Sequence, residues 1–327
     1  MRVLLLGASG TIGSATARAL TRHGHDVVCF LRKAQSSQAS AAPLKGADSL
    51  RGLTLRFGDP CSLESLRRDA FASDAFDAVV SCMASRTGTP RDAWRVDHQA
   101  HLDVLQAAKE AGVQNFVQLS AICVQKPVLA FQHAKLAFEN ALIASGMTYS
   151  IVRPTAFFKS LSGQLERVKK GKPFLIFGNG KLTACQPISD DDLGDFIAGC
   201  LQLQSRHNQI LSIGGPGPAI TPLDQGAYLF KLLGKKPKFK SVPLGLLDLI
   251  IGFLTVIGKV IPAASDKAEL ARIGRYYATE SMLVWDAVKQ RYDANATPSH
   301  GTHTLFDAYA LWLEGEGVPD RREHAVF

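Results

Sequence analysis

The stretch that decides the fold is RVLLLGASGTIG, residues 2–13 of a chain of 327. Its first five residues are an apolar run typical of a buried parallel strand, and the next seven form a GxxGxxG loop. Such glycines let the chain turn sharply, let backbone N–H groups approach a pyrophosphate, and let the following helix pack closely. A helix is expected from Thr11 to about His23, so the loop has the setting of a dinucleotide site. The residues predicted to bind the dinucleotide here are Gly7, Ser9, Gly10, Thr11, Ile12 and Gly13.

Strand and helix patterns alternate outward from this loop. Strands are expected at 2–6, 26–31, 53–57, 77–81, 115–120 and 148–152, and helices at 62–72, 91–111 and 130–145. This alternation predicts an α/β fold with a doubly wound parallel sheet, Rossmann-like, in which the crossovers are right-handed. The polar stretch 33–50 is expected to be a loop.

The pattern loosens after Arg153. Helices are expected near 157–170, 190–203, 222–233, 265–277 and 303–315, and short strands near 174–177, 184–188 and 209–213. We therefore expect a dinucleotide-binding Rossmann domain over 1–155 and a smaller substrate-binding region over 156–327, partly integrated with the sheet.

Composition excludes several classes of protein. Hydrophobic residues make up 46% of the chain, which excludes a mostly disordered protein. The six cysteines show no CxxC spacing, so we expect neither a zinc site nor disulfides, and a reduced compartment. His98 and His101 are expected to be exposed helix residues rather than metal ligands. The glycine loop begins so close to Met1 that no targeting peptide is expected, which indicates a bacterial protein or one that has already been processed.

Lysine and arginine exceed aspartate and glutamate by 37 to 29, a net charge of +8. Lysines gather at 169–172 and 235–240, which we interpret as solvated loops. No helix-turn-helix or zinc-finger spacing accompanies them, so no nucleic-acid partner is expected.

The most apolar segment runs from Leu244 to Ile261. It is shorter than the roughly 20 residues of a membrane span, and Asp248 and two glycines interrupt it. A buried helix is the simplest expectation. A partly exposed helix that meets a membrane or an apolar ligand is the alternative.

The second predicted strand ends in Arg32 and Lys33, where an acidic residue would bind a ribose 2′-hydroxyl. An arginine there can grip a 2′-phosphate through two hydrogen bonds, so the sequence favours NADP(H) over NAD(H). Asp59, after the third strand, is a candidate for the adenine amine. The predicted cofactor contacts further include Ser81, Pro154 and Phe157.

The helix at 130–145 carries Phe131 and Lys135, and the strand before it ends at Ser120. This arrangement resembles that of short-chain dehydrogenases, in which a tyrosine and a lysine four residues later share a helix face and the tyrosine protonates a carbonyl oxygen. Ser120 and Lys135 match the scheme as catalytic residues, with Lys135 also on the nicotinamide ribose. Phe131 replaces the tyrosine. Either catalysis has been lost, or the substrate is a conjugated C=C bond, which needs no phenol because its π system spreads the charge.

The residues up to about 215 resemble the atypical short-chain dehydrogenases, the group of isoflavone reductases and NmrA-like regulators. Segments of the second half resemble the NADPH-dependent 8-vinyl reductases of chlorophyll and bacteriochlorophyll biosynthesis. These segments are RPTAFFK (153–159), PISDDDL (187–193), IGGPG (213–217), ARIGRYYATESML (271–283) and ATPSHGT (296–302).

The resemblance implies that the 8-vinyl group of a divinyl chlorophyllide or protochlorophyllide is reduced to ethyl, with a magnesium chlorin or porphyrin as substrate. The predicted substrate contacts are Phe131, Phe157, Phe158, Arg275, Tyr276 and Tyr277, and Lys159, Arg272 or Arg275 could pair with the propionate. The protein itself is expected to hold no metal. Segment 244–261 is a candidate for peripheral contact with a photosynthetic membrane.

Two other readings stay open at this point. The chain could be an ene-reductase for another conjugated substrate. It could instead be a non-enzymatic NADP(H)-binding redox sensor or assembly factor, which the missing tyrosine favours. An apolar cavity beside the nicotinamide would favour an enzyme, and a sealed core a sensor.

Overall fold

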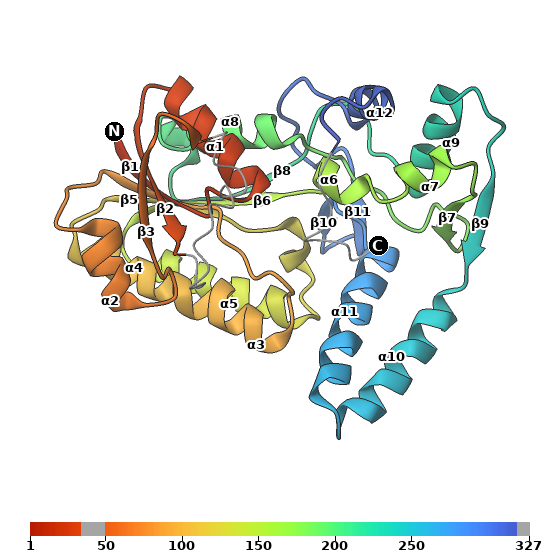
Figure 1. The fold of residues 1–327 in the computed structure, drawn as a ribbon, viewed down its shortest axis with the longest axis horizontal. Helices are drawn as coiled ribbons and strands as arrows, with labels where there is room; N and C mark the ends of the chain where they lie inside the picture. Colours follow the sequence, from red (N-terminus) through yellow and green to blue (C-terminus); the bar gives the residue numbers. More distant parts are fainter. Residues whose placement is uncertain (34–49, 319–327) are drawn as a thin grey trace, which may run out of the picture.

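A seven-stranded sheet forms the centre of the computed structural model, which describes residues 1–33 and 50–318 (Figure 1). The strand order is β3-β2-β1-β4-β5-β6-β8, and all neighbours are parallel. The strands are β1 (Arg2–Leu6), β2 (Asp26–Arg32), β3 (Thr54–Gly58), β4 (Ala78–Ser81), β5 (Asn115–Leu119), β6 (Thr148–Pro154) and β8 (Gln209–Ile213). The order reverses between β1 and β4, as in a doubly wound sheet, so the predicted fold class is confirmed. Apart from its end residues, the loop predicted over 33–50 lies outside the described part.

Helices cover both faces of the sheet (Figure 1). The run in β1 is apolar throughout because Val3 and Leu5 pack into the core on one face, and Leu4 and Leu6 into the core on the other. The first face is covered by α1 (Thr11–Arg22) and α8 (Asp190–Gly199). The second is covered by α2 (Leu63–Ser65), the π-helical η2 (Leu66–Phe71), α3 (Pro90–Ala93), the π-helical η3 (Trp94–Ala100), α4 (His101–Glu110) and α5 (Ala130–Ala144).

Two elements from beyond the predicted domain boundary at 155 belong to the sheet layers. β8 extends the sheet beside β6, and α8 packs along α1. The approach is close, since a Cβ atom at Gly194 would lie 2.8 Å from the carbonyl carbon of Ala15. The boundary itself stays a prediction.

A third apolar core joins residues of the second half of the chain to η4 and the start of α5. Around it and beside it lie η4 (Ile122–Gln125), α6 (Phe158–Leu161), α7 (Leu165–Lys169), α9 (Pro222–Leu232) and α12 (Leu305–Glu314), with the strand pairs β7 (Phe174–Phe177) with β9 (Phe239–Val242) and β10 (Val284–Asp286) with β11 (Arg291–Asp293). The short η5 (Gln204–Arg206) instead leads into β8. The strand expected near 184–188 was wrong. Only isolated bridges form at Cys185 and Ile188, because Pro187 between them has no N–H for a ladder.

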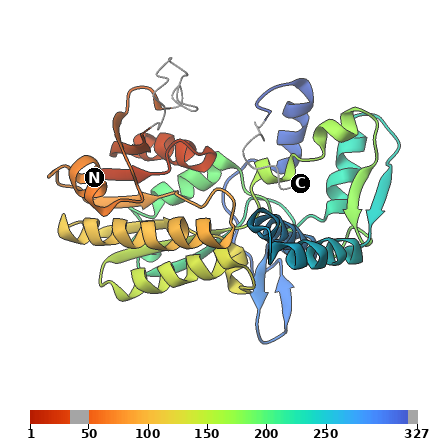
Figure 2. The ribbon, with the colours of Figure 1, turned by 60° about the horizontal axis from the view of Figure 1, so that its bottom comes forward.

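Helices α10 (Leu244–Gly258) and α11 (Pro262–Thr279) form a hairpin that projects from the body (Figures 1 and 2). The two helices pack along each other. The expectation of a buried helix at 244–261 was wrong, because no residue of α10 is buried. None of the helices in the described ranges is long and apolar enough to cross a membrane.

Candidate functional site

The glycine loop connects β1 to α1 at the carboxyl edge of the sheet, where doubly wound folds bind ligands. Gly7 has a φ of +81°, and a Cβ atom at Gly13 would lie 2.0 Å from the carbonyl oxygen of Gly7. The N-cap residue, Gly10, provides no side-chain hydrogen bond, and the first turn of α1 holds no acidic residue. The first N–H groups of α1 therefore suit an anion such as a pyrophosphate.

Arg32 and Lys33 lie exposed where β2 ends, beside the end of β3. No acidic residue takes the final position of β2. The Asp59 carboxylate accepts a hydrogen bond from the N–H of Cys61 at 2.9 Å, so it stabilises its own turn. Arg32 is therefore well placed for a phosphate, and Asp59 is less free to bind adenine than the sequence suggests.

Lys135 forms a buried ion pair that was not predicted. Its Nζ donates to Oδ1 of Asp97 at 2.9 Å, and the N–H of Ser85 donates to the same oxygen at 3.1 Å. Asp97 is 1% exposed and lies in the π-helical η3, a distortion frequent at functional sites. Its Oδ2 is buried with no hydrogen-bond partner among the described residues. This oxygen and the Lys135 ammonium offer an acceptor and a donor, which suits the ribose hydroxyls of a cofactor.

Ser120 belongs to a second buried network. Its hydroxyl donates to Glu139, and Nε of Arg153 donates to the same carboxylate at 3.2 Å. With its proton engaged by a carboxylate, Ser120 offers a substrate its lone pairs rather than its hydrogen. Glu139 was not predicted. It follows Lys135 by one helical turn on α5, and this four-residue spacing could have indicated that the two side chains lie on the same face of the helix.

A buried hydrogen bond connects Ser81, the last residue of β4, to His101, the first residue of α4. Ser81 Oγ lies 2.9 Å from Nε2 of His101, and Nδ1 of His101 lies 2.8 Å from the carbonyl oxygen of Val96. Burial, with a smaller effect of the Lys135 charge, lowers the pKa of His101 to about 4, so its imidazole is neutral. The expectation of exposed histidines was wrong, since His101 is buried and His98 is half-buried.

Three of the predicted substrate residues meet in the third core. These are Phe131, Phe158 and Tyr276. The Tyr276 hydroxyl donates to the carbonyl oxygens of Cys123 and Lys126 at 3.0 and 3.2 Å. Burial raises the pKa of Tyr276, so its phenol stays protonated near neutral pH.

The other predicted contacts are spread more widely. Phe157 is partly buried and packs against the core of the sheet, just after the buried Pro154. Tyr277 is more exposed, and its hydroxyl lies 3.9 Å from Sγ of Cys123. Arg275 pairs with Asp248 of α10 rather than with the third core.

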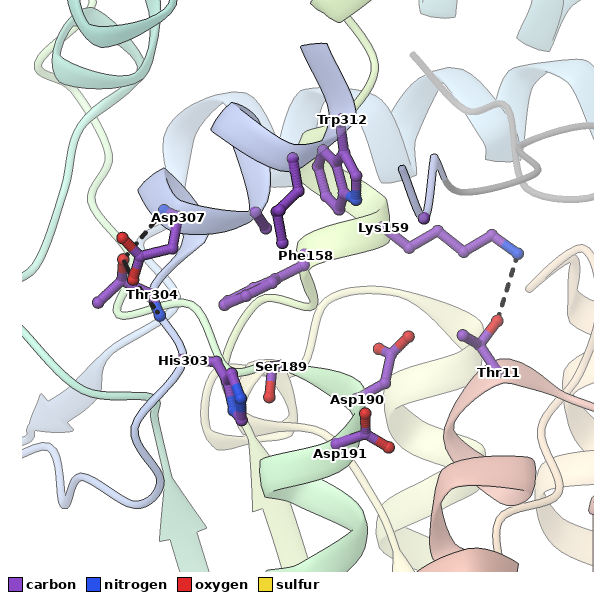
Figure 3. A pocket seen from close by; sticks show the side chains of 13 residues that line it. Thr11, Phe158, Lys159, Ser189, Asp190, Asp191, His303, Thr304, Asp307 and Trp312 are labelled. Carbon is purple, nitrogen blue, oxygen red and sulfur yellow. Dashed lines mark hydrogen bonds between the residues drawn. The ribbon is translucent and has the colours of Figure 1, made fainter. Parts of the chain in front are cut away.

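A cavity of about 420 Å³ opens between the start of α1, α6, the start of α8 and α12 (Figure 3). Its lining includes Thr11, Phe158, Lys159, Asp190 and Trp312. Burial, followed by the neighbouring Asp191 charge, raises the pKa of Asp190 to about 6. The cavity thus joins the phosphate loop to elements of the second half.

Comparison with known proteins agrees with this geometry. A family model described as NAD(P)H-binding matches residues 7–204. The chloroplastic divinyl chlorophyllide a 8-vinyl-reductase of Cucumis sativus is 47% identical over 332 residues, which cover 99% of this chain and 79% of that protein. The protein of the same name from Oryza sativa subsp. indica is 49% identical over 331 residues, 99% of this chain and 82% of that protein. The NADPH complex of leucoanthocyanidin reductase from Vitis vinifera matches with a TM-score of 0.68, covering 96% of this chain and 100% of that chain at 15% identity, a likeness of fold.

The fold, the glycine loop and the matching family model define an NAD(P)H-binding protein with a Rossmann-like sheet. Within that type, the chain belongs to the divinyl chlorophyllide a 8-vinyl-reductase family. The predicted resemblance and the predicted cofactor, NADP(H), are both confirmed.

Proposed function

We propose that this protein reduces the 8-vinyl group of a divinyl chlorophyllide or protochlorophyllide to an ethyl group, using NADPH. One observation carries this assignment over other short-chain dehydrogenase chemistry. Helix α5 keeps Lys135 but places Phe131, buried in apolar surroundings, one turn before it. Such a site can hold a nicotinamide cofactor without offering a phenol to a carbonyl oxygen, which suits a conjugated vinyl group.

NADPH supplies a hydride when bound, and the reduction of a vinyl group takes that hydride and one proton, one on each carbon. The side chains around the site hold and orient the reactants. Lys135 and Asp97 bind the ribose, while Ser120, just after β5, is held in place by Glu139. Gly7 to Gly13 bind the pyrophosphate, and Arg32 with Lys33 the 2′-phosphate. Phe157, after the end of β6, borders the cofactor, whereas Ser81 and Pro154 are buried at the ends of β4 and β6 and support the sheet edge beneath it.

The pigment is a large flat magnesium macrocycle with a propionate. The buried rings of Phe131, Phe158 and Tyr276 provide an apolar wall for this macrocycle, and Tyr277 lies at a more exposed edge. Arg275 can reach the propionate only by exchanging its present partner, Asp248.

An absorbance assay tests the function directly. We expect purified protein with NADPH and 3,8-divinyl chlorophyllide a to shift the Soret band to the blue, because the conjugated vinyl group is lost. NADH is the control for cofactor choice. Tight NADPH binding without a Soret shift would contradict the assignment and favour the redox sensor or another ene-reductase.

We further propose peripheral contact with a membrane through 244–261, for a protein of the cytoplasm or, in a processed plant form, of the chloroplast. Large apolar side chains of α10 and its end recur at three- and four-residue spacing on one exposed stripe, and Phe253 is 64% and Val260 84% exposed. The residues of this stripe are Leu246, Leu249, Phe253, Val256 and Val260. Exposed lysines accompany the stripe at 235–240, before α10, and at Lys259 and Lys267. Apolar surface next to positive charge suits an anionic lipid interface.

Vesicle sedimentation tests this contact. We expect the protein to bind vesicles containing phosphatidylglycerol more strongly than phosphatidylcholine vesicles, and F253N/V256N to lower binding at least tenfold, about 1.4 kcal/mol of lost apolar transfer. L203N/V288N, at exposed apolar residues elsewhere, is the matched control. Loss of self-association in F253N/V256N, with vesicle binding unchanged, would show that a second copy covers the stripe instead.

A further inference from the structure

Lys159 lies beyond the predicted domain boundary at 155, yet its side chain reaches the phosphate loop. It is the second residue of α6, and its Nζ donates to Oγ1 of Thr11 at 3.3 Å (Figure 3). Thr11 is the first residue of α1 and lies in the GxxGxxG loop. Because β6 leads through Phe157 directly into α6, the position of Lys159 is set by the central sheet.

The charges around Lys159 leave it available for an anion. Within the described ranges, no carboxylate lies within ion-pair distance of its ammonium, and Thr11 is its hydrogen-bond partner. Arg18, on α1, is already paired with Asp191 at 2.6 Å. Asp190 faces the same cavity and is influenced by Lys159, Arg18 and Asp191. A full positive charge therefore lies next to the uncapped first turn of α1, where the N–H groups also favour negative charge.

We infer that Lys159 binds the pyrophosphate of NADP(H), from the side of α1 that faces α6 and α12. The inference rests on the proposed binding of the cofactor by residues 7–13. It assigns Lys159 to the cofactor, whereas the sequence suggested a partner for the pigment propionate. The cofactor site then has two cations with different roles. Arg32 binds the 2′-phosphate, which only NADPH carries, and Lys159 binds the pyrophosphate, which NADPH and NADH share.

Equilibrium binding of three probes separates these tasks. NADPH and NADH both carry the pyrophosphate, whereas adenosine 2′-monophosphate carries only the 2′-phosphate. We expect Lys159→Gln to raise the Kd of NADPH and NADH by the same factor, about tenfold, because a charge-assisted hydrogen bond is lost from both. The Kd of adenosine 2′-monophosphate stays unchanged. Lys159→Arg, which keeps the charge, restores most of the affinity, and Lys170→Gln, at an exposed lysine after α7, changes nothing.

Each other outcome overturns the inference in a recognisable way. Unchanged Kd values for both dinucleotides in Lys159→Gln remove the pyrophosphate contact. A raised KM for the pigment with unchanged dinucleotide affinity assigns Lys159 to the propionate. Equal weakening of all three probes, with a lowered Tm, shows a general loss of structure rather than a lost contact. If the unmodified protein binds neither dinucleotide, the proposed function fails together with the inference.

Discussion

Replacing Asp97 by asparagine is expected to destabilise the protein by about 3 kcal/mol, because it leaves the buried Lys135 ammonium without its counter-charge. It is also expected to weaken NADPH binding, since Lys135 is then no longer held in its present direction. Urea unfolding measures the first effect, and titration of NADPH fluorescence the second. Asp266→Asn, at an exposed carboxylate on α11, is the matched control and should change neither.

A double replacement distinguishes the ion pair from a general packing role. When Lys135→Met is combined with Asp97→Asn, both buried charges are gone, so much of the lost stability should return while NADPH affinity stays low. Additive losses of stability would contradict the pairing. Asp97 both pairs with Lys135 and offers its free oxygen to the ribose, so Asp97→Glu, which keeps the carboxylate, should recover cofactor affinity better than Asp97→Asn.

Replacing Arg32 by alanine is expected to raise the Kd of NADPH by about 30-fold, or roughly 2 kcal/mol, and to leave that of NADH unchanged. The physical reason is that a guanidinium can bind a 2′-phosphate through two hydrogen bonds, a group that NADH lacks. Isothermal titration with both cofactors measures the ratio. Arg22→Ala, at an exposed arginine in the last turn of α1, is the control. Equal weakening for both cofactors would remove the assigned role of Arg32.

Much of the sheet could be predicted because the residue types of each strand depend on which of its faces are buried. The run at 2–6 is apolar on both faces since both faces are covered, and the glycine loop has a specific geometric task. The chemical roles of Arg32 and Phe131 could also be predicted. Arg32 stands where an acidic residue would bind the ribose, and Phe131 stands where short-chain dehydrogenases have a tyrosine.

The partners of Lys135 and Ser120 could not be predicted in the same way. Asp97 and Lys135 are 38 residues apart, and the π-helical turns of η3 that place Asp97 have no simple periodicity in the sequence. The same limit explains the error at His101, where burial depends on the neighbouring α5 and β4 rather than on its own helix.

The apolar segment at 244–261 shows a different limit. Hydropathy describes the composition of a helix but not the surface that covers it. α10 has the composition of a core helix, yet it packs along α11, with which it shares the Arg275–Asp248 pair, and none of its residues is buried.

The close packing of α8 on α1 has a consequence for the order in which the protein is made. The loop at 7–13 and the helix behind it are synthesised first, but α8 and β8, which cover that helix and widen the sheet, follow only at 190–213. A growing chain that has reached residue 155 therefore carries its phosphate loop on a sheet that lacks β8, with the part of α1 that contacts α8 open to water. The cofactor site can reach its final form only after most of the protein has left the ribosome.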